Sequence, residues 1–148
     1  MQAVIFIGVQ ASGKSTFFKE RFFDTHVRIN LDMLKTRPRE KTLLDACLRS
    51  KQSFVVDNTN PTIDDRKRYI LPAKEANFEV VGYYFDSTMA ASIQRNLRRT
   101  GNQHIPAPGI WNTYRKLQVP TLGEGFDKLY SVKLDPGGSF VVEEWQAG

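Results

Sequence analysis

The chain has 148 residues, of which 41% are apolar and 25% charged, so its size and composition predict one ordinary domain spanning residues 1–148. No uninterrupted apolar stretch approaches membrane-spanning length, and an apolar strand at residue 3 leaves no room for a secretory leader. We therefore expect an intracellular, cytoplasmic protein with no membrane contact. A formal net charge of +5 favours a polyanionic partner, although moderately basic proteins without one are common.

A glycine-rich phosphate-binding pattern follows the first predicted strand. Residues 3–7 are an apolar run typical of a buried parallel strand, residues 8–15 fit GxxxxGKS/T, and residues 14–23 have helical apolar spacing. Loop N–H groups and the helix N-terminus can then bind a polyphosphate, Lys14 can reach the β- and γ-phosphates, and Ser15 can ligate Mg²⁺; a plain glycine turn is the alternative. We predict an ATP and Mg²⁺ site formed by Gly8, Gln10, Ala11, Ser12, Gly13, Lys14, Ser15 and Thr16.

An aspartate follows the second predicted strand. Residues 26–30 alternate apolar and polar side chains as a strand, and residues 31–35 open a short helix that contains Asp32. In open parallel sheets the ligand crevice lies outside the carboxyl ends of the strands, which makes Asp32 a candidate general base. An aspartate in the first turn of a helix is also favoured by the helix dipole, and spacing alone leaves both roles open.

The third strand also ends in an aspartate. Residues 41–49 resume helical spacing after an interruption at Pro38, and residues 53–57 are an apolar strand that ends in Asp57. In P-loop proteins a carboxylate at such a strand end lies near Mg²⁺ and its waters. Turn formation is the alternative, because Asp, Asn and Pro all favour turns, but the phosphate loop earlier in the chain favours the metal role.

A pair of arginines lies in the second half of the chain. We expect a helix capped by Thr62 and kinked at Pro72, a strand at residues 78–85, and a further helix that contains Arg95 and Arg99 on one face. Two guanidiniums on one face can bind a polyphosphate, but the helix dipole also favours arginines near a C-terminus, and spacing alone leans to that second role.

The remaining elements complete an α/β pattern. After a loop at residues 104–109, residues 111–117 predict a short helix and residues 121–125 a loop. Residues 129–134 and 139–145 predict two strands joined by a turn. The alternation of strands and helices predicts a mainly parallel sheet with helices on both faces.

In these motifs the sequence resembles the kinase domain of polynucleotide 5'-kinase/3'-phosphatases, from the first strand to the last. The matching stretches of the first half are residues 12–17, residues 30–32, and residues 57–61 with Arg66 and Tyr69 behind them. In the second half they are residues 104–106, 114–116, 120–122 and 124–126, and Arg95 and Arg99 fit the RxxxR lid of that family.

The resemblance implies a P-loop kinase fold with a helical arginine lid, ATP and Mg²⁺ as cofactors, and 5'-hydroxyl ends of DNA or RNA as substrate. It implies that Asp32 takes the proton of the 5'-hydroxyl, and that Lys14 and the two lid arginines, Arg95 and Arg99, act on the phosphates. The implied metal residues are Ser15 and Asp57, and the implied substrate contacts are Asp32, Lys35, Thr59, Asn60 and Arg66.

The sequence departs from the family at three points. Leu31 replaces the usual arginine, Lys35 stands where some members have an arginine, and no phosphatase domain precedes the kinase, so we expect any phosphatase or ligase step to come from a separate partner. A kinase of a nucleotide, sugar or antibiotic is the alternative enzyme. A nucleotide-dependent binding module is a third interpretation, and the presence of Asp32 with both lid arginines disfavours it.

Overall fold

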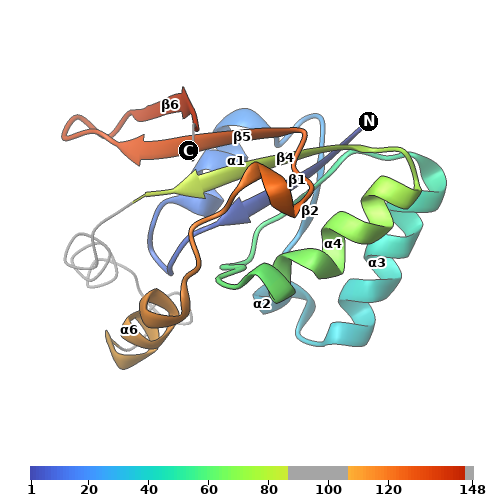
Figure 1. Cartoon of the computed structure of the whole chain (residues 1–148), viewed down its shortest axis with the longest axis horizontal. Helices are drawn as coiled ribbons and strands as arrows, with labels where there is room; N and C mark the ends of the chain where they lie inside the picture. Colours follow the sequence, from blue (N-terminus) through green and yellow to red (C-terminus); the bar gives the residue numbers. More distant parts are fainter. Residues whose placement is uncertain (87–106, 146–148) are drawn as a thin grey trace.

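The computed structural model describes residues 1–86 and 107–145 (Figure 1). Within these ranges one sheet contains the strands β1 (Gln2–Ile7), β2 (Val27–Ile29), β3 (Phe54–Val56), β4 (Glu79–Phe85), β5 (Lys128–Leu134) and β6 (Phe140–Glu144). Their order in the sheet is β2-β3-β1-β4-β5-β6. Strands β1 to β5 pair in parallel and β6 pairs antiparallel with β5, which confirms the predicted mainly parallel sheet.

The helices lie on both faces of the sheet, as predicted. They are α1 (Lys14–Arg21), α2 (Leu31–Leu34), α3 (Arg37–Ser50), α4 (Ile63–Glu75) and α6 (Ala107–Lys116), with a 3-10 helix η2 (Leu122–Glu124). Helices α3 and α4 pack together on one face (Figure 1). Helix α1 covers the other face. No helix in the described ranges is long and apolar enough to cross a membrane.

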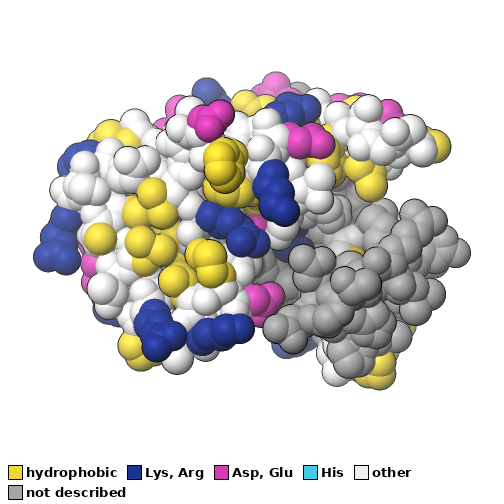
Figure 2. Space-filling view, turned by 180° about the vertical axis from the view of Figure 1, so that it is seen from behind, with side chains coloured by type: hydrophobic (Ala, Val, Ile, Leu, Met, Phe, Trp, Pro, Cys, Tyr) yellow, Lys and Arg dark blue, Asp and Glu magenta, His cyan; other side chains and the backbone are white. Residues whose placement is uncertain are grey.

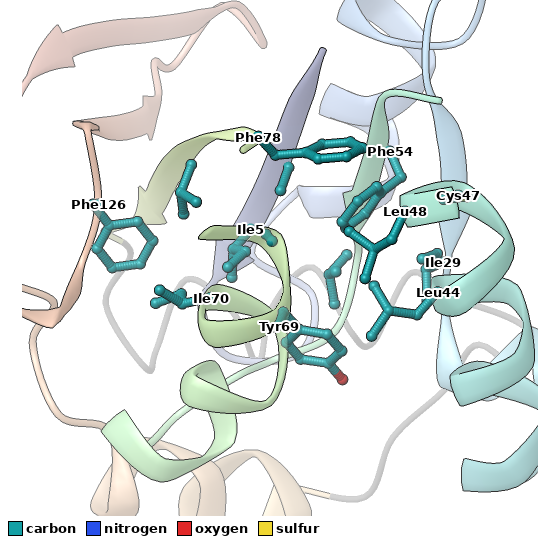
Figure 3. Close-up of a cluster of buried hydrophobic side chains, with 14 of the residues drawn as sticks. Ile5, Ile29, Leu44, Cys47, Leu48, Phe54, Tyr69, Ile70, Phe78 and Phe126 are labelled. Atoms are coloured by element: carbon teal, nitrogen blue, oxygen red, sulfur yellow. The ribbon is translucent and has the colours of Figure 1, made fainter. Parts of the chain in front are cut away.

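The central strand β1 is buried on both sides, which explains its unbroken apolar run. Ala3, Ile5 and Ile7 face the α3/α4 side, where they join the core cluster drawn in Figure 3 with Tyr69 and other residues. Val4 and Phe6 face α1 and join a second cluster rich in phenylalanine. Alternate residues of a strand point to opposite faces, so one short segment supplies both cores.

Several predicted boundaries shift in the structure. Helix α3 begins at Arg37, because Thr36 caps it and Pro38 lies in its first turn, where a missing backbone N–H is tolerated. Helix α4, by contrast, begins after the predicted Thr62 cap and runs through Pro72 to Glu75. Helix α6 begins at Ala107, earlier than the predicted start at Trp111, and the part of the predicted loop that precedes it lies outside the described residues.

The sheet order brings three loop starts together. Strand β3 lies between β2 and β1, so the segments that follow Ile7, Ile29 and Val56 leave the sheet at its carboxyl edge on neighbouring strands. These segments are the phosphate loop, the Asp32 helix and the turn after Asp57. In a parallel sheet this edge is where ligands bind.

Candidate nucleotide and phosphotransfer site

The phosphate loop connects β1 to α1 and has the backbone that its glycines allow. Gly13, the N-cap of α1, has φ 100°, a left-handed conformation that glycine adopts without strain. A Cβ atom on Gly8 would lie 2.9 Å from Phe85 Cβ and 2.9 Å from Ser12 Oγ, so only glycine fits. Ala11 also has positive φ, 60°, at a position where the sequence has no glycine. The positive φ angles of Ala11 and Gly13 thus turn the loop into the start of α1.

Lys14 lies inside this loop. Its Nζ donates to the carbonyl oxygens of Gly8 (3.0 Å) and Val9 (2.7 Å) and to Ser12 Oγ (3.3 Å), and the residue is only 8% exposed. An ammonium group held by loop oxygens can exchange them for phosphate oxygens of a bound nucleotide. The predicted phosphate role therefore agrees with the position of Lys14.

The structure brings together Ser15 and Asp57, the two residues predicted to lie at the metal. Ser15 Oγ donates to Asp57 Oδ2 at 2.9 Å, although the two residues lie on α1 and just after β3. A hydroxyl that donates its proton in a hydrogen bond still has two lone pairs, so Ser15 Oγ can also bind a metal ion. Mg²⁺ prefers oxygen ligands, such as this hydroxyl and the phosphates of a nucleotide. These residues fit Mg²⁺ with Ser15 as ligand and the buried Asp57 carboxylate behind it.

Arg28, which was not predicted as a site residue, joins this pair. Its Nε donates to Asp57 Oδ2 (2.9 Å) and its Nη2 donates to Ser15 Oγ (3.0 Å). In the sequence, Arg28 is a polar residue within a predicted strand that alternates apolar and polar side chains. Its position in that pattern therefore gave no indication of a role in the site. Only the pairing of β2 with β3 puts Arg28 next to the end of the β3 strand.

Asp32 lies exposed on α2, and two asparagines tie that short helix to the β3 turn. The Asn30 side chain caps the helix by accepting from Met33 N (2.9 Å) and donates to Asp57 O (2.6 Å). The Asn58 side chain accepts from Leu31 N (2.8 Å). The hydrogen bonds of Asn30 and Asn58 both hold α2 against the turn after β3. Asp32 therefore lies at the same edge of the sheet as the phosphate loop. This position agrees with a role on bound substrate.

A buried polar network supports Asn58 from behind. Tyr69, which is fully buried, donates to Glu40 Oε1 (2.9 Å), and Asn58 Nδ2 donates to Glu40 Oε2 (3.0 Å) and to the Tyr69 hydroxyl (3.2 Å). Arg37 donates to the same two groups. Burial, and after it the Glu40 carboxylate, raises the pKa of Tyr69, so its hydroxyl stays a donor. Fully satisfied buried networks of this kind hold their members in one geometry.

The structure corrects the predicted role of Arg66. Arg66 is 0% exposed, and its guanidinium donates to both carboxylate oxygens of Glu124 (2.7 and 3.0 Å) and to the carbonyls of Asn60, Pro61 and Gln118. Each N–H donor of the side chain thus has an acceptor within the protein. Arg66 joins α4 to the Asn60 turn and η2, in place of the predicted substrate contact.

The other predicted substrate residues differ in accessibility. The Asn60 side chain is also corrected: it is buried and donates to Phe6 O (2.8 Å), which fixes the turn to β1. Thr59 is half-buried and its carbonyl accepts from Gly8 N (3.0 Å). Lys35 is exposed directly after α2, three residues beyond Asp32. Arg95 and Arg99 lie outside the described residues, so their lid role stays a prediction.

Helix α6 is linked to the phosphate loop. Gln10 Nε2 donates to Thr113 Oγ1 at 3.0 Å. The exposed side of α6 carries Trp111 and Tyr114, whose rings are nearly parallel (14°) with centroids 6.4 Å apart. Arg115, the next residue of the helix, lines a surface hollow. The helix that carries these exposed rings is thus anchored to the nucleotide loop through the buried Thr113.

The sheet order, the phosphate loop and the Ser15–Asp57 pair define a P-loop kinase fold. Solved structures with this fold include a gluconokinase from Sinorhizobium meliloti, 17% identical over 89% of this chain and 82% of that chain, with a TM-score of 0.62. Another is Chaetomium thermophilum Kti12 in complex with ADP-AlF3, 16% identical over 92% of each chain, with a TM-score of 0.67. These likenesses confirm the predicted fold.

Three curated proteins are similar to this chain in sequence. A bifunctional polynucleotide phosphatase/kinase of Schizosaccharomyces pombe is 29% identical over 135 residues, and a putative one of Acanthamoeba polyphaga mimivirus is 31% identical over 141. Each match covers 88% of this chain, which spans about a third of the length of either relative. An L-seryl-tRNA(Sec) kinase of Methanococcus maripaludis is 27% identical over 137 residues, covering 79% of this chain and 52% of that protein. No protein-family model matches the chain.

These relatives confirm the resemblance to the kinase domain of polynucleotide 5'-kinase/3'-phosphatases. All three are named as kinases, which is the class of enzyme that the sequence predicts.

Proposed function

We propose that the chain is an ATP-dependent polynucleotide 5'-hydroxyl kinase, which transfers the γ-phosphate of ATP to 5'-hydroxyl ends of DNA or RNA. The observation that carries the proposal is the tethering of the Asp32 helix, through Asn30 and Asn58, to the turn that also presents Asp57 to the phosphate loop. The likeness to two polynucleotide phosphatase/kinases supports the choice of substrate.

The reaction assigns one task to each part of the site. Loop amides and Lys14 hold the triphosphate, and Asp32 orients the 5'-hydroxyl and accepts its proton while the hydroxyl oxygen forms a bond to the γ-phosphorus. The bond from that phosphorus to the β,γ-bridging oxygen breaks and ADP leaves. Mg²⁺, held through Ser15, would neutralise charge that develops on the phosphates. Arg95 and Arg99 are proposed to cover the phosphates from the lid.

The nucleic-acid strand is proposed to run from Asp32 toward α6. Lys35, exposed three residues beyond Asp32, offers a positive charge. Trp111 and Tyr114, 44% and 43% exposed, offer ring faces for bases. Tyr69 cannot offer a ring face to a base, because it is fully buried. Figure 2 shows Lys and Arg side chains spread over the face opposite the view of Figure 1. Because this positive charge is spread out, it is weaker support for a nucleic-acid substrate than the local aromatic and basic groups are.

A small-molecule kinase is the second candidate, since the fold is shared with a gluconokinase. Incubation with labelled ATP and Mg²⁺ separates the two: we expect label on 5'-hydroxyl DNA or RNA oligonucleotides. Label on a sugar or a free nucleotide alone would refute the polynucleotide proposal. Asp32→Asn should abolish most of the transfer. Asp64→Asn is the matched control, because Asp64 lies exposed in the first turn of α4 and undergoes the same change of charge.

A further inference from the structure

Arg28 donates hydrogen bonds to both Ser15 and Asp57, the two residues where we expect Mg²⁺. Its Nε and the Ser15 hydroxyl both donate to Asp57 Oδ2 at 2.9 Å, and its Nη2 also donates to Ser15 Oγ at 3.0 Å. The Asp57 side chain is 1% exposed and that of Arg28 is 29% exposed. A carboxylate buried to this degree needs a counter-charge, and Arg28 supplies it.

We propose that Arg28 is a built-in counter-cation of the nucleotide site, with which Mg²⁺ competes when it enters with the nucleotide. The inference rests on the proposed function only in requiring that the loop binds a magnesium nucleotide. Ser15 Oγ has one proton, which goes to Asp57, and two lone pairs, one of which already accepts from Arg28. A metal ion on the other lone pair would lie within a few ångströms of the guanidinium, and like charges at such distances repel strongly.

The surroundings of Arg28 allow it to retreat without leaving the site. Its guanidinium carbon lies 6.0 Å from the centre of the Phe18 ring, a cation–π contact that does not depend on Ser15. Release of the Nη2 bond to Ser15 would free that lone pair, while the Nε bond to Asp57 and the contact with Phe18 remain. Arg28 therefore opposes the metal without blocking it, and sets how much Mg²⁺ is needed for nucleotide binding.

The test measures binding and needs no turnover. Affinity of the full chain for a fluorescent ADP analogue is titrated with free Mg²⁺, for the wild type, Arg28→Gln, Arg28→Lys and Arg21→Gln. Arg21 lies exposed on α1 and contacts Phe17, so its substitution removes the same charge away from the Ser15–Asp57 pair. We expect Arg28→Gln to lower the half-saturating Mg²⁺ concentration at least about tenfold, and Arg21→Gln to leave it unchanged.

The second Arg28 variant keeps the experiment decisive if the first folds poorly. Arg28→Lys retains a charge but loses the planar fork that engages Ser15 and Asp57 together, so its half-saturating Mg²⁺ concentration should fall between those of the wild type and Arg28→Gln. An unchanged or higher Mg²⁺ requirement in the Arg28 variants would overturn the proposal while nucleotide binding stands. Failure of all four proteins to bind the ADP analogue at any Mg²⁺ concentration would overturn both this inference and the proposed kinase.

Discussion

Arg66→Met distinguishes a structural arginine from a substrate-binding one. The substitution leaves the Glu124 carboxylate, whose side chain is 4% exposed, without its counter-charge, and it removes the donors to three backbone carbonyls. Breaking a buried ion pair from one side typically destabilises a protein by about 3–5 kcal/mol. We therefore expect a loss of about 4 kcal/mol, which for a domain of this size lowers the melting temperature by about 8–16 °C.

Urea denaturation followed by circular dichroism measures this loss, and steady-state kinetics on the folded fraction measures substrate binding. Arg68→Met is the control, because Arg68 lies exposed on the same helix, and its stability should stay within about 0.5 kcal/mol of the wild type. Adding Glu124→Leu to Arg66→Met should recover part of the loss, since no uncompensated charge then stays buried. A loss below about 1 kcal/mol for Arg66→Met, together with a raised KM for oligonucleotides, would refute the structural role.

Three further predictions concern the site and its substrate. Asp32→Asn should lower kcat about 10²- to 10⁴-fold with ATP affinity nearly unchanged, whereas Asp64→Asn should retain normal rates; a variant with more than about a third of the wild-type kcat would refute the base assignment. Tyr69→Phe removes the hydroxyl that donates to Glu40 and accepts from Asn58, so urea denaturation should show a loss of about 1–3 kcal/mol, and kcat should fall as Asn58, which tethers the Asp32 helix, keeps only its direct bond to Glu40 within this network. For a strand held by about two to four phosphate contacts, log affinity should fall with log salt at a slope near −0.7 per contact; a flat response would favour a small-molecule substrate.

The phosphate loop and the order of elements could be predicted because their signals are local. The apolar run of β1 and the GxxxxGKS/T pattern directly behind it determine a strand, a loop and a helix start within a few residues of one another. The predicted place of Asp57 at a strand end followed from the same kind of short-range pattern. The start of α3 was missed because Pro38 disrupts a helix interior but fits its first turn, and the choice depends on the cap that Thr36 forms.

The partners of charged side chains were decided by tertiary structure alone. Arg66 follows residues 57–61, a stretch that resembles the kinase family, so the sequence favoured a substrate contact. Its acceptor Glu124 lies on η2 and comes next to Arg66 only when the second half of the chain packs against α4. In the sequence Arg28 has no feature that sets it apart from other strand residues. The pairing of β2 with β3 in the folded chain brings it into an ion pair with Asp57. The sequence by itself determined the strand, loop and helix pattern and the chemistry that each loop offers, because hydrophobic periodicity and turn propensity act between near neighbours. Which charges are buried, paired or left for a ligand depends on contacts between distant segments, and only the folded chain decides those.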